Sequence, residues 1–220
     1  CKFMYWLKTN VGKIHMTELS VSKHLAELRA EQEGFLDLSF ETICGFADHG
    51  AIVHYAATPE TDKEIRPESF LLVDSGGHYL EGTTDITRTF ALGEVTDEMR
   101  DMFTRVLRSN VSLASARFRQ GCCGLNFDIL ARAPFWDIDM DYNHGTGHGV
   151  GYVLNVHEGP NSFHWKAYPG RSADSEILPG MITTDEPGVY LEGKFGIRTE
   201  NELVARLGNK NEYGQFMYFE

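Results

Sequence analysis

Four carboxylates and one imidazole are the residues of this chain whose types and spacing could do chemistry. Asp74, Asp85, His148, Glu186 and Glu200 each lie in or next to a strand-like run, close to a glycine. Carboxylate oxygens with one imidazole suit Mn²⁺, Mg²⁺ and similar cations better than metals that prefer thiolates. Carboxylates that bridge two ions hold them about 3.5–4 Å apart, the spacing of hydrolytic two-metal sites. The residue types therefore predict a site for two metal ions.

Most of these residues also have an ordinary explanation when taken singly. Asp74 could cap a turn, Glu186 could belong to the turn that Pro187 begins, and Glu200 could pair with Arg198. Asp85 is harder to explain, because aspartate is disfavoured inside a strand. His148 lies among glycines, which leave its imidazole accessible and give it no apolar face to bury. The joint pattern favours a metal site more strongly than any single residue does.

Other active-site plans fit the sequence less well. It contains no H-E-x-x-H zinc motif and no G-x-S-x-G nucleophile motif. The glycines of 145–151 lack both the lysine of a phosphate-binding loop and the G-x-G-x-x-G spacing of a dinucleotide site. The adjacent Cys122 and Cys123 do not have the spacing of a zinc site.

Composition restricts the partners and the compartment. The chain has 220 residues, is 42% hydrophobic and carries a net charge of −12. Nucleic acids and anionic membranes attract basic surfaces, so we expect neither as a partner. The four cysteines form no regular framework and fit the reduced thiols of a cytoplasmic protein. No apolar run approaches the roughly 20 residues that span a bilayer.

Apolar periodicity predicts one α+β domain without a linker. Helical spacing is found over 2–11 and 20–32, and Thr96 or Asp97 can cap a third helix. We expect Gly76 and Gly77 to form a turn, and the polar and aromatic stretch Asn161–Leu178 to form a loop. The predicted strands are Leu38–Ile43, Ala51–Tyr55, Phe70–Asp74, Ile86–Leu92, Met181–Asp185, Gly196–Thr199, Glu202–Leu207 and Gln215–Phe219.

A faint internal repeat relates the two halves of the chain. Each half offers a strand that ends in a carboxylate, Asp74 or Glu186, followed by a glycine turn. A second strand with another carboxylate, Asp85 or Glu200, comes next. This order indicates a pseudo-twofold duplication.

The ligand pattern and its surroundings resemble the pita-bread metallopeptidases, which include methionine aminopeptidase, prolidase and aminopeptidase P. The resemblance covers nearly the whole chain and is greatest to the catalytic domain of the Xaa-Pro aminopeptidase (aminopeptidase P) family. It implies an α+β pita-bread fold, like those of creatinase and methionine aminopeptidase, with pseudo-twofold duplicated halves. The segments that carry it are Gly50–Tyr55, Asp74–Gly77, Gly82–Thr89, His144–Gly151, Asn155–Pro160 and Thr184–Gly188.

The resemblance also implies the metal ligands and the cofactors. Asp74 is expected to bind one ion, and Asp85 and Glu200 to bridge both. His148 and Glu186 are expected to complete the second site. We expect two divalent metal ions, Mn²⁺ first, with Zn²⁺ or Co²⁺ as alternatives.

Further roles follow from the same resemblance. Glu186 is expected to move a proton towards the leaving proline nitrogen. His54 and His157 are expected to contact the substrate and donate to the developing oxyanion. His144 is placed beside the penultimate proline, and Arg198 steadies the acidic residues as a partner of the metal ligands.

The implied function is hydrolysis of the peptide bond between an N-terminal residue and a penultimate proline. One alternative is a prolidase that acts on Xaa-Pro dipeptides, because it shares the metal ligands. A second is a non-catalytic pita-bread module that binds peptides or proteins. The retained ligands disfavour that module, and also a metal-free hydrolase like creatinase. His24 and His164 lie in no motif, and we expect no role for them.

The ends of the chain carry an expectation of their own. It begins at Cys1 inside a helical pattern and stops at Glu220 inside a strand-like run. Unfinished strands leave backbone groups unpaired. We therefore expect residues 1–220 to be a catalytic domain truncated at both ends, a poor enzyme by itself, and part of a full-length homodimer.

Overall fold

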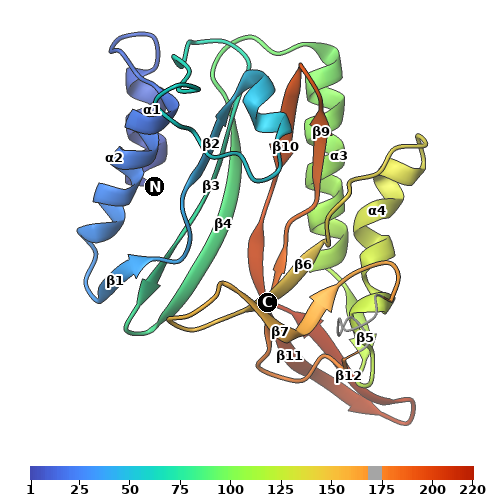
Figure 1. Cartoon of the computed structure of the whole chain (residues 1–220). Coiled ribbons are helices and arrows are strands. Elements are labelled where there is room, and N and C mark those ends of the chain that lie inside the picture. Colours follow the sequence, from blue (N-terminus) through green and yellow to red (C-terminus); the bar gives the residue numbers. More distant parts are fainter. Residues whose placement is uncertain (168–174) are drawn as a thin grey trace.

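The computed structural model describes residues 1–167 and 175–220. Antiparallel strands fill the centre, with one pair of helices on either side of them (Figure 1). The described strands form a four-stranded sheet of β1–β4, a two-stranded ribbon of β9 and β10, and a six-stranded sheet in the order β5-β12-β11-β8-β6-β7. No described helix is long and apolar enough to cross a membrane.

The N-terminal half packs two helices against the four-stranded sheet. Thr17 caps the second helix, because its side chain accepts from the Ser20 amide while Ser20 bonds back to the Thr17 amide. Phe3, Leu7 and Val21 bury their side chains against the sheet. The elements are α1 (Lys2–Asn10), α2 (Glu18–Ala30), β1 (Phe35–Leu38), β2 (Ile43–Phe46), η1 (Ala47–Ala51), β3 (Phe70–Tyr79) and β4 (Gly82–Ala91).

The C-terminal half packs its helices against the ribbon and the six-stranded sheet. Thr96 caps α3 by accepting a hydrogen bond from the Met99 amide at 3.2 Å, as predicted. The helical elements are α3 (Asp97–Ala114), η2 (Gly124–Asn126) and α4 (Asp128–Trp136). The strands are β5 (Arg117–Arg119), β6 (Gly147–Val150), β7 (His157–Phe163), β8 (Ile182–Asp185), β9 (Gly188–Leu191), β10 (Phe195–Arg198), β11 (Asn201–Asn211) and β12 (Gly214–Phe219).

Two predicted strands and one predicted turn are wrong. Residues 39–42 connect β1 to β2, and 51–55 form the end of η1 and a turn. Gly76 and Gly77 lie inside β3, whose hairpin turn comes later, at Leu80 and Glu81. A Cβ on Gly76 would lie 1.9 Å from the Thr84 carbonyl oxygen, so glycine is needed there for close strand approach and not for a turn.

Helix α4 and strand β6 were not predicted from the sequence. Helix α4 is short and contains Pro134, which hides its periodicity. Strand β6 is half glycine, and a Cβ on Gly147 would lie 1.8 Å from the Thr184 carbonyl oxygen of β8. The glycines of this segment therefore allow strands to approach each other closely. The predicted loop over 161–178 begins inside β7, and its residues 168–174 lie outside the described part.

The predicted repeat corresponds to two hairpins. In the first, β3 carries Asp74 and β4 carries Asp85, with Gly76 opposite Asp85. In the second, β9 pairs with β10, and Glu186 and Glu200 lie just outside its two open ends. The Glu200 amide donates to the Thr87 carbonyl of β4 at 3.2 Å and so joins the hairpins.

Close packing of η1 against β10 gives a testable prediction. A Cβ on Gly196 would lie 1.7 Å from the Gly50 carbonyl oxygen, so Gly196→Ala should force the backbones apart. Overpacking of this kind costs about 1–3 kcal/mol, measured as a loss in the free energy of denaturant unfolding. Gly82→Ala is the control, because nothing lies within 4 Å of its added Cβ. Equal stability of the two variants would contradict this packing.

Candidate metal centre

The predicted site residues meet in one cavity of about 700 Å³. It lies where the two hairpins face each other, and its walls include β3, β4, β6 and the ends of β8 and β10. All nine residues predicted for the site line it: Asp74, Asp85, His148, Glu186, Glu200, His54, His144, His157 and Arg198. The structure therefore brings them together, while the role of each stays a prediction.

His148 presents one nitrogen to the acids. Its Nδ1 lies 2.9 Å from the Gly149 carbonyl oxygen, which can only accept, so Nδ1 carries the hydrogen. Nε2 then points at Asp85 Oδ2, 3.5 Å away, and Glu186 Oε1, 3.3 Å away. A fixed tautomer with the other nitrogen free is the usual arrangement of a metal-binding histidine.

Ligand atoms of Asp85, His148 and Glu200 all lie within 4.8 Å of one another, which is close enough to share an ion. Asp74 adds a fourth group from the neighbouring strand. Its Oδ2 accepts from Arg198 Nη2 at 2.7 Å, whereas its buried Oδ1 has no hydrogen-bond partner among the described residues. A buried carboxylate oxygen without a donor costs free energy, and a cation would satisfy it.

Burial and neighbouring negative charges raise the pKa values of several acids in the cavity. Burial raises the pKa of Glu186 to about 7, and neighbouring acids add to this effect, although His148 and Arg198 oppose it. Burial also raises the pKa of Asp74 above its usual range and that of Glu200 well above it. Arg198 contacts this group directly, through an ion pair with Asp74. The donor set therefore fits divalent metal ions, which would offset the remaining negative charge.

A directed chain of hydrogen bonds links Asp74 to His144. His144 Nδ1 lies 2.8 Å from the Gly145 carbonyl oxygen and must donate to it, so Nε2 accepts from the Tyr190 hydroxyl at 2.9 Å. The same hydroxyl accepts from Arg198 Nη1 at 2.8 Å. Burial lowers the pKa of His144 to about 3, so this ring is neutral. With both nitrogens engaged, His144 offers the cavity ring surface and not a hydrogen bond.

The remaining predicted histidines lie close to the ligand set. The ring of His157 lies 4.2 Å from that of His148, centroid to centroid, in an edge-on arrangement. Burial lowers the pKa of His157, and the charges of His148 and His54 act in the same direction. A neutral His157 keeps one N–H with which it can donate to a substrate oxygen.

Two residues at the site were not predicted from the sequence. His164 lines the cavity, although the expectation that it has no role stays untested, whereas His24 lies on α2 and stacks on Trp6 at 4.0 Å. Thr87 is fully buried, donates to Glu200 Oε2 at 2.7 Å and accepts from Arg198 Nε at 3.1 Å. Strand alternation could have identified it, because Thr87 shares a face with Asp85, two residues before it.

Comparison with known proteins identifies the family. The model of metallopeptidase family M24 matches residues 1–206. The chain belongs to this family. It is 43% identical to Aminopeptidase P2 of Arabidopsis thaliana over 218 residues, which is 98% of this chain and 30% of that protein. It is 46% identical to Aminopeptidase P1 of the same plant over 190 residues, 86% of this chain and 29% of the relative.

Solved M24 structures confirm the predicted pita-bread fold. An X-prolyl aminopeptidase from Caenorhabditis elegans, described as a cytosolic enzyme with a di-nuclear active site, has a TM-score of 0.91 and 34% identity. The match covers 100% of this chain and 35% of that one. A prolidase from Pyrococcus furiosus has a TM-score of 0.78 and 25% identity, covering 92% of this chain and 56% of the prolidase. The chain thus spans about a third of the length of its aminopeptidase P relatives.

The raised carboxyl pKa values predict how pH affects stability. In the metal-free protein, Glu186 and Glu200 bind their protons more tightly in the folded state than in the unfolded chain. The free energy of unfolding of the metal-free protein should therefore fall as pH rises from about 4 through about 7. Mn²⁺ needs the deprotonated acids. The increase in Tm on adding Mn²⁺ should therefore be larger at about pH 8 than at about pH 5.5. An equal or reversed increase would contradict this electrostatic account.

The buried Thr87 hydroxyl gives a second prediction. Thr87→Val keeps the shape of the side chain but removes the donor to Glu200. Loss of a group that orients a ligand lowers metal affinity by about 10–100-fold, which Mn²⁺ titration calorimetry would measure. Thr104→Val is the matched control, since Thr104 is exposed on α3 and its hydroxyl donates to the Arg100 carbonyl oxygen of the same helix. Unchanged affinity in Thr87→Val would show that the hydroxyl does not orient the ligand.

Proposed function

We propose that this chain is the catalytic domain of a dinuclear-metal Xaa-Pro aminopeptidase, which releases an N-terminal residue that precedes proline. The observation that carries the proposal is the single cavity that holds the complete acid and imidazole set together with His54, His144 and His157. Identities of 43% and 46% to two aminopeptidase P relatives support it. Peptides with proline in second position are therefore the proposed substrates.

The metal ligands are proposed as predicted from the sequence. Asp74 would hold one ion, His148 and Glu186 would hold the other, and Asp85 and Glu200 would be shared by both. When bound, divalent ions supply Lewis-acid activation of water and of the peptide carbonyl. We propose Mn²⁺ as the ion, because the ligands are mostly carboxylates, with Zn²⁺ or Co²⁺ as alternatives.

The chain's own groups supply proton transfer and orientation. We propose that Glu186, which lines the cavity, takes a proton from water and passes it to the leaving proline nitrogen. We propose that His54 and His157, which line the cavity, donate to the carbonyl oxygen as it gains charge. The ring surface of His144 is available to the proline ring, because its nitrogens are both engaged elsewhere.

A cellular location and an oligomeric state are also proposed. The worm relative is described as a cytosolic enzyme, and free cysteines fit a reducing compartment. We propose the same location, and a homodimer for the full-length protein.

A prolidase is the second candidate, because the Pyrococcus furiosus prolidase shares the fold. Substrate length separates the two. Mn²⁺-loaded full-length protein should cleave an Xaa-Pro-Xaa tripeptide faster than the Xaa-Pro dipeptide. Faster cleavage of the dipeptide would favour a prolidase, and cleavage of neither would contradict both.

Glu186 provides the mechanistic test. Glu186→Gln removes a group proposed both to bind metal and to move a proton, so kcat should fall by at least about 100-fold. His24→Ala, a histidine on α2 stacked on Trp6, should retain parental turnover. Near-parental kcat in Glu186→Gln would refute the assignment.

A further inference from the structure

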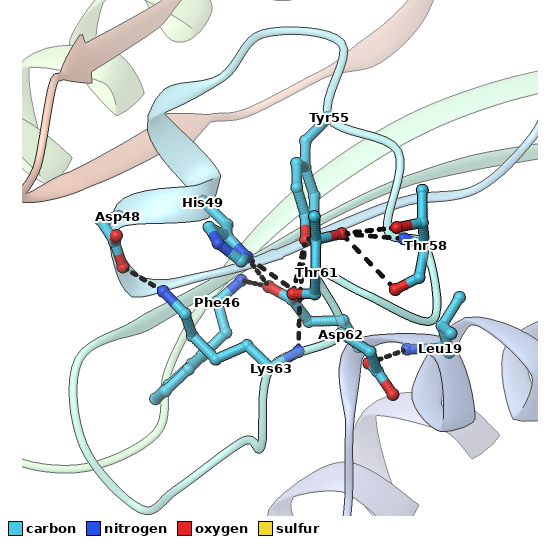
Figure 2. Close-up of polar contacts among 10 residues, drawn as sticks. Leu19, Phe46, Asp48, His49, Tyr55, Thr58, Thr61, Asp62 and Lys63 are labelled. Carbon is cyan, nitrogen blue, oxygen red and sulfur yellow. Dashed lines mark hydrogen bonds and ion pairs between the residues drawn. The ribbon is translucent and has the colours of Figure 1, made fainter.

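A buried carboxylate outside the metal centre accepts hydrogen bonds from the segment that forms one wall of the cavity. Glu18, the first residue of α2, is 0% exposed. Its carboxylate accepts from the Phe46 amide at 2.7 Å, the Tyr55 hydroxyl at 2.8 Å and the Lys63 amide at 3.2 Å. His49 Nδ1 lies 3.0 Å from both oxygens and must donate to them. Figure 2 shows Phe46, His49, Tyr55 and Lys63 grouped around one set of these contacts.

The donors come from both ends and the middle of residues 46–63. This segment contains η1, but its residues 52–63 form neither helix nor strand. It also supplies Val53, His54, Tyr55 and Ala56 to the cavity wall. The backbone hydrogen bonds of 52–62 in this stretch are local, such as Ile52 to His49 and Tyr55 to Ile52, so the bonds to Glu18 connect it to a separate element, α2.

Reciprocal bonds tie the end of the segment to the start of α2. The Glu18 amide donates to the Lys63 carbonyl oxygen at 3.1 Å, and the Leu19 amide donates to Asp62 Oδ1 at 3.0 Å. The Lys63 ammonium pairs with Asp48 and not with Glu18. A carboxylate can accept about four hydrogen bonds. The donors to Glu18 all come from residues 46–63, so its carboxylate serves this segment.

The other side of the segment is fixed by the strand that leads to the metal ligands. Gly50 of η1 packs directly on Gly196 of β10, two residues before Arg198. The wall that carries His54 is therefore held between Glu18 on its outer side and β10 on its inner side. A change at Glu18 can reach His54 through this segment, while the candidate metal ligands lie on other strands or next to their ends.

We propose that Glu18 is a positioning residue of the active site, which holds His54 and Tyr55 in place against the metal centre. The proposal rests on the proposed peptidase function for its catalytic consequence, and on the contacts of Glu18 for its structural one. Glu18→Gln is the sharpest change, because it keeps the size of the side chain but turns an NH₂ group towards donors. Glu27→Gln, the same change at an exposed site on α2, is the control.

The catalytic arm is a double-mutant cycle in the Mn²⁺-loaded protein. Glu18→Gln should lower kcat for an Xaa-Pro-Xaa peptide by about 100-fold, the order of loss for a misplaced active-site group, with parental metal content. In a His54→Ala background the same change should cost less than about 3-fold, because its target is already gone. Equal losses in both backgrounds would overturn the proposal, since they indicate a general effect on the fold.

The second experiment measures backbone hydrogen exchange and does not depend on peptidase activity. Amides of 47–56 should exchange hydrogen faster in Glu18→Gln than in the parent and in Glu27→Gln, while those of β3 and β4 stay unchanged. Tyr55→Phe removes one donor to Glu18 and should accelerate exchange only around residue 55. It serves as the second variant should Glu18→Gln not fold. Parental exchange in the folded variants would overturn the proposal. A parent that cleaves no Xaa-Pro peptide would refute the proposed function alone, because the exchange data still decide the role of Glu18.

Discussion

Repulsion among buried carboxylates is the constraint on which the rest of this structure depends. Asp74, Asp85, Glu186 and Glu200 line one cavity, and burial raises the pKa of three of them. Removal of charges from water is unfavourable unless other charges or donors compensate. Arg198 and His148 offset part of the negative charge of these acids. Among the described residues, Asp74 Oδ1 has no hydrogen-bond partner, so it is a position where further positive charge would be favourable. Divalent cations would complete the balance.

The two hairpins bring these acids together without long connections. Strands β3 and β4 place Asp74 and Asp85 on neighbouring strands, and Glu186 and Glu200 lie at the open end of the β9–β10 ribbon. Glycines at the crossings let the strands come close enough for short side chains to share an ion. Strands and the residues next to their ends therefore carry the candidate ligands. By contrast, His54 and Tyr55 lie on an irregular segment that contacts Glu18.

That the five candidate ligands lie together in one cavity could be predicted from the sequence, because their chemistry is carried by residue type. Their spacing and resemblance to a known family sufficed for the fold. Gly76, Gly77 and Gly147 misled the prediction of elements, because a glycine that permits close approach has the same sequence signature as a glycine in a turn. Thr87 was missed because a buried threonine looks neutral in a hydrophobic pattern, and its partners are more than 100 residues away. The role of Glu18 depends on a contact with Lys63, 45 residues later, which only the folded chain reveals.

Metal stoichiometry tests the central claim most directly. Full-length protein should be freed of metal, saturated with Mn²⁺, separated from unbound ion and measured by elemental analysis. The account predicts close to two Mn²⁺ per chain, and a clear loss in Asp85→Asn, which removes charge from a proposed bridging ligand. A parent protein that retains no metal at saturating Mn²⁺ would show that the cavity does not balance its charge in this way.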